Sequence, residues 1–181
     1  MKNILVVSGH TDLNDSVANK LILEDLKAKL PSAGFDLLDE LYPDFKIDVK
    51  AEREKLTKAD IIVLQFPVFW YSYPSLMHKW MEDVFVFGFS HGTGKALSGK
   101  TLLASLTSGA PEEVYKKDYT VDDMTAPLKQ TAALCSMKWA GAVYTGGVSY
   151  ALRNVPEKRR EIEEKALLHA QRLMDKLNGL S

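Results

Sequence analysis

The chain has 181 residues, of which 46% are hydrophobic and 26% are charged, as is typical of a single soluble globular domain. Its formal net charge of −1 gives no overall indication of binding to nucleic acid or to an anionic membrane surface, and neither partner is expected. The single cysteine excludes an intrachain disulfide framework and a cysteine-based metal site, and no metal is expected. The lone thiol and the absence of a signal-like segment before the first strand predict a cytoplasmic protein.

Apolar runs and helical periodicity predict five strands that alternate with helices along the chain. We expect strands over residues 2–8, 35–39, 61–66, 100–107 and 139–144. We expect helices over residues 16–30, 49–56, 74–84, 127–137 and 156–177. Such alternation is typical of a doubly wound α/β sheet in three layers, most simply in the flavodoxin-like strand order 2-1-3-4-5. No repeat or linker interrupts it, so residues 1–181 are predicted to form one domain.

The loop after the third strand is the most informative segment. It reads Pro67-Val68-Phe69-Trp70-Tyr71-Ser72-Tyr73 and carries four aromatic side chains in seven positions. In a parallel sheet covered by helices, ligands bind outside the carboxyl ends of the strands. One or two of these rings could belong to the core, but a strand-to-helix loop normally runs over the surface. The cluster therefore predicts an apolar wall for a cofactor.

Two further loops are expected at the same edge of the sheet, because strands one, three and four are neighbours in this order. The loop after the first strand supplies His10 and polar side chains at the start of a helix, where free N–H groups and the helix dipole favour an anion such as phosphate. The loop after the fourth strand, residues 107–110, has small side chains that let backbone amides approach a ligand. A phosphate, a flat ring and a polar ring edge together describe a flavin mononucleotide.

The chain also resembles the flavodoxin-like NAD(P)H:quinone oxidoreductases, the group that contains DT-diaphorase. It is most similar to the bacterial branch with general stress protein 14 and the cytosolic ancillary subunit of glutathione-gated potassium efflux systems. The matching segments cover most of residues 1–110 and read GHTDLNDSVANK, ELYPDFKIDVKAE, ADIIVLQFPVFWYSYPSLMHKWMEDVF, GFSHGTGKAL and LSGKTLLASLTSGA. The FPVFWYS stretch before a proline-started helix is the most specific of them.

The resemblance implies bound FMN, with FAD as the alternative, and NAD(P)H as co-substrate. It assigns the cofactor phosphate to His10, Ser16, Val17, Ala18 and Asn19. It assigns the flavin rings and ribityl chain to Pro67, Val68, Phe69, Trp70 and Tyr71, and the pyrimidine edge to Thr107, Ser108, Gly109 and Ala110. The chain departs from the family at Ala110, where a second glycine is common.

The resemblance further implies a homodimer in which Phe87, Phe89 and His91 line the partner's site. Family members orient the substrate with tyrosine and histidine after the fourth-strand loop. This chain offers Tyr115 and Tyr119 there, without a nearby histidine.

The predicted activity is a two-step, two-electron transfer of hydride from NAD(P)H through the flavin to a quinone or similar acceptor. Trp70, Gly109 and Tyr115 are the candidate catalytic residues. One alternative is a flavodoxin-type electron carrier without its own substrate pocket. Another is an ancillary regulatory subunit that associates peripherally with a membrane potassium efflux transporter. A receiver-type signalling domain is disfavoured, because the first and third strands lack the acidic residues that it needs at their ends. The choice between NADH and NADPH stays open.

Overall fold

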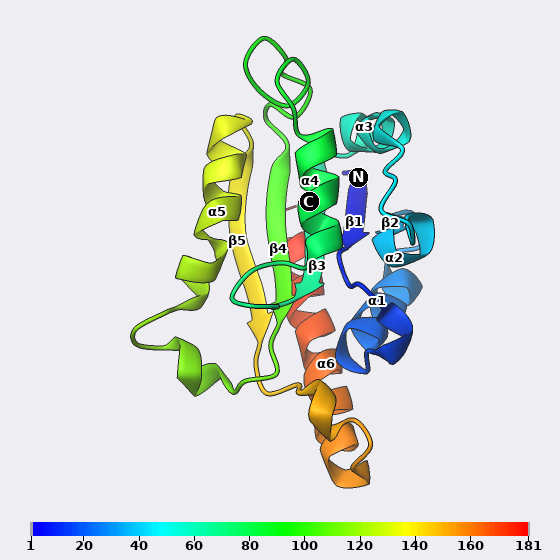
Figure 1. The fold of residues 1–181 in the computed structure, drawn as a ribbon, viewed down its shortest axis with the longest axis vertical. Helices are drawn as coiled ribbons and strands as arrows, with labels where there is room; N and C mark the ends of the chain where they lie inside the picture. Colours follow the sequence, from blue (N-terminus) through cyan, green and yellow to red (C-terminus); the bar gives the residue numbers. More distant parts are fainter. Residues whose placement is uncertain (1, 181) are drawn as a thin grey trace.

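A parallel five-stranded sheet forms the centre of the molecule, as seen in a computed structural model that describes residues 2–180 (Figure 1). The strands are β1 (Ile4–Ser8), β2 (Gly34–Leu37), β3 (Ile61–Pro67), β4 (Thr101–Thr107) and β5 (Lys138–Thr145). They are ordered β2-β1-β3-β4-β5, and every neighbouring pair is parallel. The predicted α/β fold class and strand order are confirmed.

Helices cover both faces of the sheet (Figure 1). They are α1 (Ala18–Lys29), α2 (Leu38–Leu41), α3 (Val49–Lys58), α4 (Ser75–Val84), α5 (Val121–Leu134) and α6 (Pro156–Asn178), with short 3-10 turns η1 (Leu13–Asp15), η2 (Glu112–Tyr115) and η3 (Tyr150–Leu152). The apolar sides of α1 and α6 pack on one face, and those of α2 to α5 pack on the other. Across residues 2–180, no helix has the length and apolar character needed to cross a bilayer.

The α5 helix begins earlier than its sequence indicates. The prediction placed its start at Pro127, but the helix starts at Val121, and Pro127 lies inside it. A capping box explains this start: the Asp123 N–H donates to Thr120 Oγ1 at 3.2 Å, and the Thr120 N–H donates to the Asp123 carboxylate at 2.7 Å. The predicted second strand is also too long, because the chain turns into α2 at Leu38.

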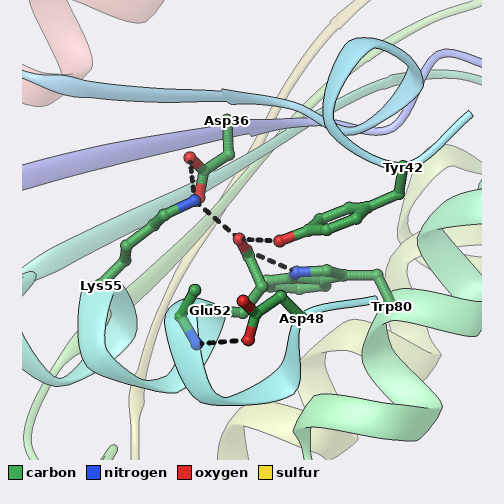
Figure 2. Close-up of polar contacts among 7 residues, drawn as sticks. Asp36, Tyr42, Asp48, Glu52, Lys55 and Trp80 are labelled. Carbon is green, nitrogen blue, oxygen red and sulfur yellow. Dashed lines mark hydrogen bonds and ion pairs between the residues drawn. The ribbon is translucent and has the colours of Figure 1, made fainter. Parts of the chain in front are cut away.

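A fully buried carboxylate on α3 connects four elements of the fold (Figure 2). Glu52 accepts hydrogen bonds from the Tyr42 hydroxyl at 2.7 Å, from Lys55 Nζ at 2.7 Å and from Trp80 Nε1 at 2.8 Å. The same Lys55 Nζ donates to Asp36 Oδ1 of β2 at 2.8 Å. Burial raises the pKa of the Asp36 carboxyl from its ordinary 3.8 to about 6.

This network bears on the aromatic loop, because Trp80 belongs to α4, the helix that follows the loop. Trp80 is 0% exposed, and among the described residues Glu52 is the acceptor for its indole N–H. A buried N–H without an acceptor is costly, so Glu52 fixes the rotation of α4. The helix that follows the aromatic loop is therefore connected through Glu52 and Lys55 to Asp36 of β2.

Candidate functional site

A cavity of about 570 Å³ opens at the carboxyl ends of the central strands, a size within the range of small-molecule sites. The predicted site residues that line it are His10, Ser16, Val17, Ala18, Asn19, Pro67, Val68, Phe69, Thr107, Ser108 and Gly109. The other predicted residues, Trp70, Tyr71, Ala110 and Tyr115, do not belong to its lining. The fold thus brings the three predicted loops together around one space.

The first loop presents the start of α1 to this cavity. Ser16 Oγ accepts hydrogen bonds from the backbone N–H of Asn19 at 3.1 Å and from Asn19 Nδ2 at 3.2 Å, so the Ser16 side chain is bonded to the first turn of α1. The N–H of Val17 has no hydrogen-bond acceptor within the described part of the chain. Together with the helix dipole, this free donor favours an anion at the helix start.

The imidazole of His10 lies at the edge of the same loop. Its Nδ1 accepts the N–H of Asp12 at 3.0 Å, so in the neutral ring the proton is on Nε2. Burial lowers the pKa of His10, and the carboxylates of Asp39, Asp12 and Asp15 oppose this effect only in part. His10 is therefore a neutral hydrogen-bond donor at pH 7, and it packs edge-on against the Phe69 ring with centroids 6.1 Å apart.

A buried polar floor lies under the cavity. Asn19 Oδ1 accepts from Gln65 Nε2 at 2.6 Å and from Thr107 Oγ1 at 3.1 Å, which ties α1 to β3 and β4. Gln65 Oε1 and Ser8 Oγ are buried and have no partner among the described residues. Ser8 and Gln65 do not belong to the cavity lining, and buried unpaired groups of this kind are commonly completed by an ordered water.

The aromatic loop closes in a tight two-residue turn. Phe69 and Ser72 exchange both backbone hydrogen bonds, at 2.9 and 3.0 Å, and Trp70 and Tyr71 between them have φ values of 50° and 65°. Glycine or asparagine usually occupies such positions, so two bulky aromatic residues there are strained. The turn leaves the Trp70 side chain 94% exposed, whereas Tyr73 packs against the core. The prediction of a surface loop is confirmed for Phe69, Trp70 and Tyr71.

The tyrosines form a second aromatic group next to the cavity. The Tyr71 ring meets Tyr115 and Tyr119 edge-on, with centroid distances of 6.5 and 5.4 Å. Tyr115 in turn meets Tyr144 of β5 at 6.1 Å, and the Tyr144 hydroxyl is 2.6 Å from Ser108 Oγ. Tyr115 is therefore connected to the fourth-strand loop through Tyr144, which the sequence did not single out.

The fourth-strand loop presents backbone donors. The carbonyl groups of Ser108 and Ala110 accept the N–H groups of Val148 and Gly147 at 3.0 and 2.7 Å. The N–H groups of Gly109 and Ala110 form no hydrogen bond within residues 2–180. Ala110 is not among the residues with positive φ, so alanine in place of the family's glycine causes no backbone strain.

A fourth loop, between β5 and α6, completes the cavity and was missed in the sequence. It contributes Val148, Ser149, Tyr150, Ala151 and Arg153 to the lining. The available signal was the pair Gly146-Gly147 at the end of the fifth strand, followed by an aromatic and a basic residue. Since β5 pairs with β4, its loop leaves from the same edge of the sheet.

The fold agrees with that of known relatives of this chain. Residues 2–170 of this chain match the protein family that is described as having a flavodoxin-like fold. The chain belongs to this family. Among its flavodoxin-like relatives is the glutathione-regulated potassium-efflux system ancillary protein KefG of Enterobacter sp. (strain 638), which is 36% identical over 159 residues and 85% of each chain. The ancillary protein KefF of the same strain is 38% identical over 139 residues, 75% of this chain and 78% of KefF.

The solved structures give the same result. General stress protein 14 of Treponema denticola, crystallised in complex with FMN, has a TM-score of 0.84 and 25% identity, covering 96% of this chain and 99% of that one. An NADPH-quinone reductase of P. pentosaceus has a TM-score of 0.75, covering 94% and 96%; at 20% identity it shows the shared fold. The resemblance to the bacterial branch of the family is therefore confirmed.

Proposed function

We propose that this chain is a single flavin-binding domain that acts as an NAD(P)H dehydrogenase (quinone)-type oxidoreductase, passing hydride from NAD(P)H through bound FMN to a quinone or similar acceptor. The observation that carries the proposal is the convergence of an anion-binding helix start, an apolar aromatic wall and free backbone N–H groups around one cavity. The FMN complex of general stress protein 14 supports the choice of cofactor.

The residues present fit FMN. The start of α1 would hold the phosphate through its free N–H groups, with Ser16 and the His10 Nε2–H as further donors. Val68 and Phe69 would pack against the ring system. When bound, FMN supplies the two-electron chemistry, while the protein binds and orients it.

Three groups of the protein would act on the reaction. The N–H groups of Gly109 and Ala110, which form no hydrogen bond within residues 2–180, would stabilise negative charge at the pyrimidine edge. The exposed Trp70 and Tyr71 would flank the face on which NAD(P)H and then the acceptor stack. Tyr115, held against Tyr71 and Tyr144, would orient the substrate at the mouth of the site. These roles rest on position and chemistry.

The segment between α4 and β4 supports a homodimeric site. It lies at the amino ends of the strands, opposite to the cavity, and exposes Phe87 with 67% of its surface accessible (Figure 1). It is therefore remote from the cavity of its own chain. In a homodimer, this segment would line the site of the partner.

A second candidate function is an ancillary role in potassium efflux from the cytoplasmic side of a membrane. The similarity to KefG and KefF favours it, because both are named as ancillary proteins of such systems. The two functions are compatible in one protein. A flavodoxin-type electron carrier is the remaining alternative, and steady-state oxidation of NAD(P)H by the chain with a quinone would exclude it.

The proposal is tested first by the colour of the protein. We expect heat to release a yellow compound that absorbance and mass identify as FMN. Anaerobic NADH or NADPH should bleach the bound flavin, and a quinone should restore its absorbance. A colourless protein that takes up neither FMN nor FAD would contradict the proposal, as would a bound flavin that neither nucleotide reduces.

A further inference from the structure

The cavity lining carries more negative than positive charge, which does not favour a phosphate. Among the described residues that line it, the charged side chains are Asp12, Asp15 and Arg153. His10 adds no charge at pH 7, because burial lowers its pKa. Two carboxylates would repel a phosphate dianion, and the one guanidinium in the lining is the positive charge that can offset this repulsion.

Arg153 is held in place by its own loop. Its guanidinium carbon lies 3.5 Å from the centroid of the Tyr150 ring, its Nη2 donates to the Tyr150 hydroxyl at 2.6 Å, and its Nη1 donates to the Tyr150 carbonyl at 3.0 Å. The side chain is 25% exposed, and its Nε lies 3.2 Å from Asp15 Oδ1. A stacked, partly buried arginine is pre-organised for anion recognition, because little side-chain entropy is lost on binding.

The ion pair with Asp15 holds this cation in the same cavity as the start of α1. Asp15 ends η1 and directly precedes Ser16, whose hydroxyl is bonded to the first turn of α1. The guanidinium is thus held beside the helix start whose free N–H groups attract an anion. Its five N–H donors allow contact with a phosphate oxygen while the stack on Tyr150 is kept.

We propose that Arg153 recognises the cofactor phosphate, and thereby makes the site select FMN over riboflavin, while Asp15 competes for the same guanidinium. This inference rests on the proposed flavin function and deepens it. It assigns phosphate recognition to the loop after β5 as well as to the helix start. In this proposal, Arg153 strengthens the binding of the cofactor phosphate and Asp15 weakens it.

The test compares FMN with riboflavin, which lacks only the phosphate. Cofactor-free protein would be titrated with each flavin, and the dissociation constants read from quenching of flavin fluorescence. Arg153→Gln is expected to weaken FMN binding about tenfold or more, the scale of a charge-assisted hydrogen bond, and to leave riboflavin binding within about twofold. Asp15→Asn is expected to strengthen FMN binding several-fold, because it removes a like charge and frees the guanidinium.

Two further variants complete the design. Arg159→Gln removes a guanidinium from the neighbouring α6, where Arg159 pairs with Glu163 outside this cavity, and should leave both flavins unaffected. Arg153→Lys keeps the charge without the planar stack and should fall between the parent and Arg153→Gln. Thermal unfolding of each variant, without flavin, checks that the fold is retained.

The outcomes separate the two proposals. An unchanged FMN-to-riboflavin ratio in Arg153→Gln would overturn the inference, and so would equal weakening of both flavins, which indicates a structural role. A parent protein that binds neither flavin would overturn both the inference and the proposed function. If FMN binds but NAD(P)H does not reduce it, the proposed activity fails, while the affinity ratio still decides the role of Arg153.

Discussion

Replacing Glu52 with alanine is expected to destabilise the fold by about 2–6 kcal/mol, because two buried donors lose their acceptor. The fully buried carboxylate accepts three hydrogen bonds, each between 2.7 and 2.8 Å long. Alanine would leave the Trp80 N–H and the Tyr42 hydroxyl buried without an acceptor, at about 1–3 kcal/mol each. Lys55 would keep Asp36 as its partner, so its charge does not become unpaired.

The conservative variant separates hydrogen bonding from charge. In Glu52→Gln, the amide oxygen can still accept from Trp80, and the amide N–H groups can donate to the Tyr42 hydroxyl. The variant loses only the ion pair with Lys55, whose side chain is 35% exposed. We therefore expect a loss of about 1 kcal/mol.

Urea unfolding followed by far-UV circular dichroism at pH 7.5 would measure these changes as shifts in midpoint at constant m. Glu54→Ala is the matched control, because Glu54 is exposed on the same helix and should cost no more than about 0.5 kcal/mol. A Glu52→Ala variant within about 1 kcal/mol of the parent would refute the reasoning. Equal losses in the two Glu52 variants would show that charge, rather than the number of hydrogen bonds, is decisive.

Three further predictions concern the network, the turn and the polar floor. Burial raises the pKa of Asp36 in the folded protein to about 6, so the folded state holds this proton more tightly than the unfolded state does. The resulting contribution to stability is complete below pH 4 and is lost as the pH rises through 6. The urea midpoint of Asp36→Asn should therefore rise relative to that of the parent between pH 4 and 7. Trp70→Gly relieves a positive φ and should not lower the melting temperature, yet quinone reduction should fall; a lower melting temperature would contradict the strain. Asn19→Ala leaves Gln65 and Thr107 without their acceptor, so it should lower the free energy of unfolding by about 2–3 kcal/mol, measured by urea unfolding. It should also weaken flavin binding in a titration. Unchanged flavin affinity would argue against a role of the polar floor in the site.

Local pattern was enough to predict the sheet and three sides of the cavity. The buried, mostly apolar runs of β3 and β4 mark central strands, since strands covered on both faces tend to be apolar along nearly their whole length. The order of the strands then places their loops at one edge. Four aromatics in a loop, a helix start and small residues after β4 each indicate one part of a flavin site.

Contacts between distant segments are decided only by the tertiary structure. Residues 49–56 read as a short charged helix, yet Glu52 is buried because Tyr42, directly after α2, and Trp80 of α4 pack against it. The loop after β5 reaches the cavity, and Arg153 meets Asp15 from the far end of the chain. Sequence periodicity reports which face of an element is buried. Partners for charged and polar groups depend on how the elements pack in three dimensions, and that packing determines the electrostatics of the site.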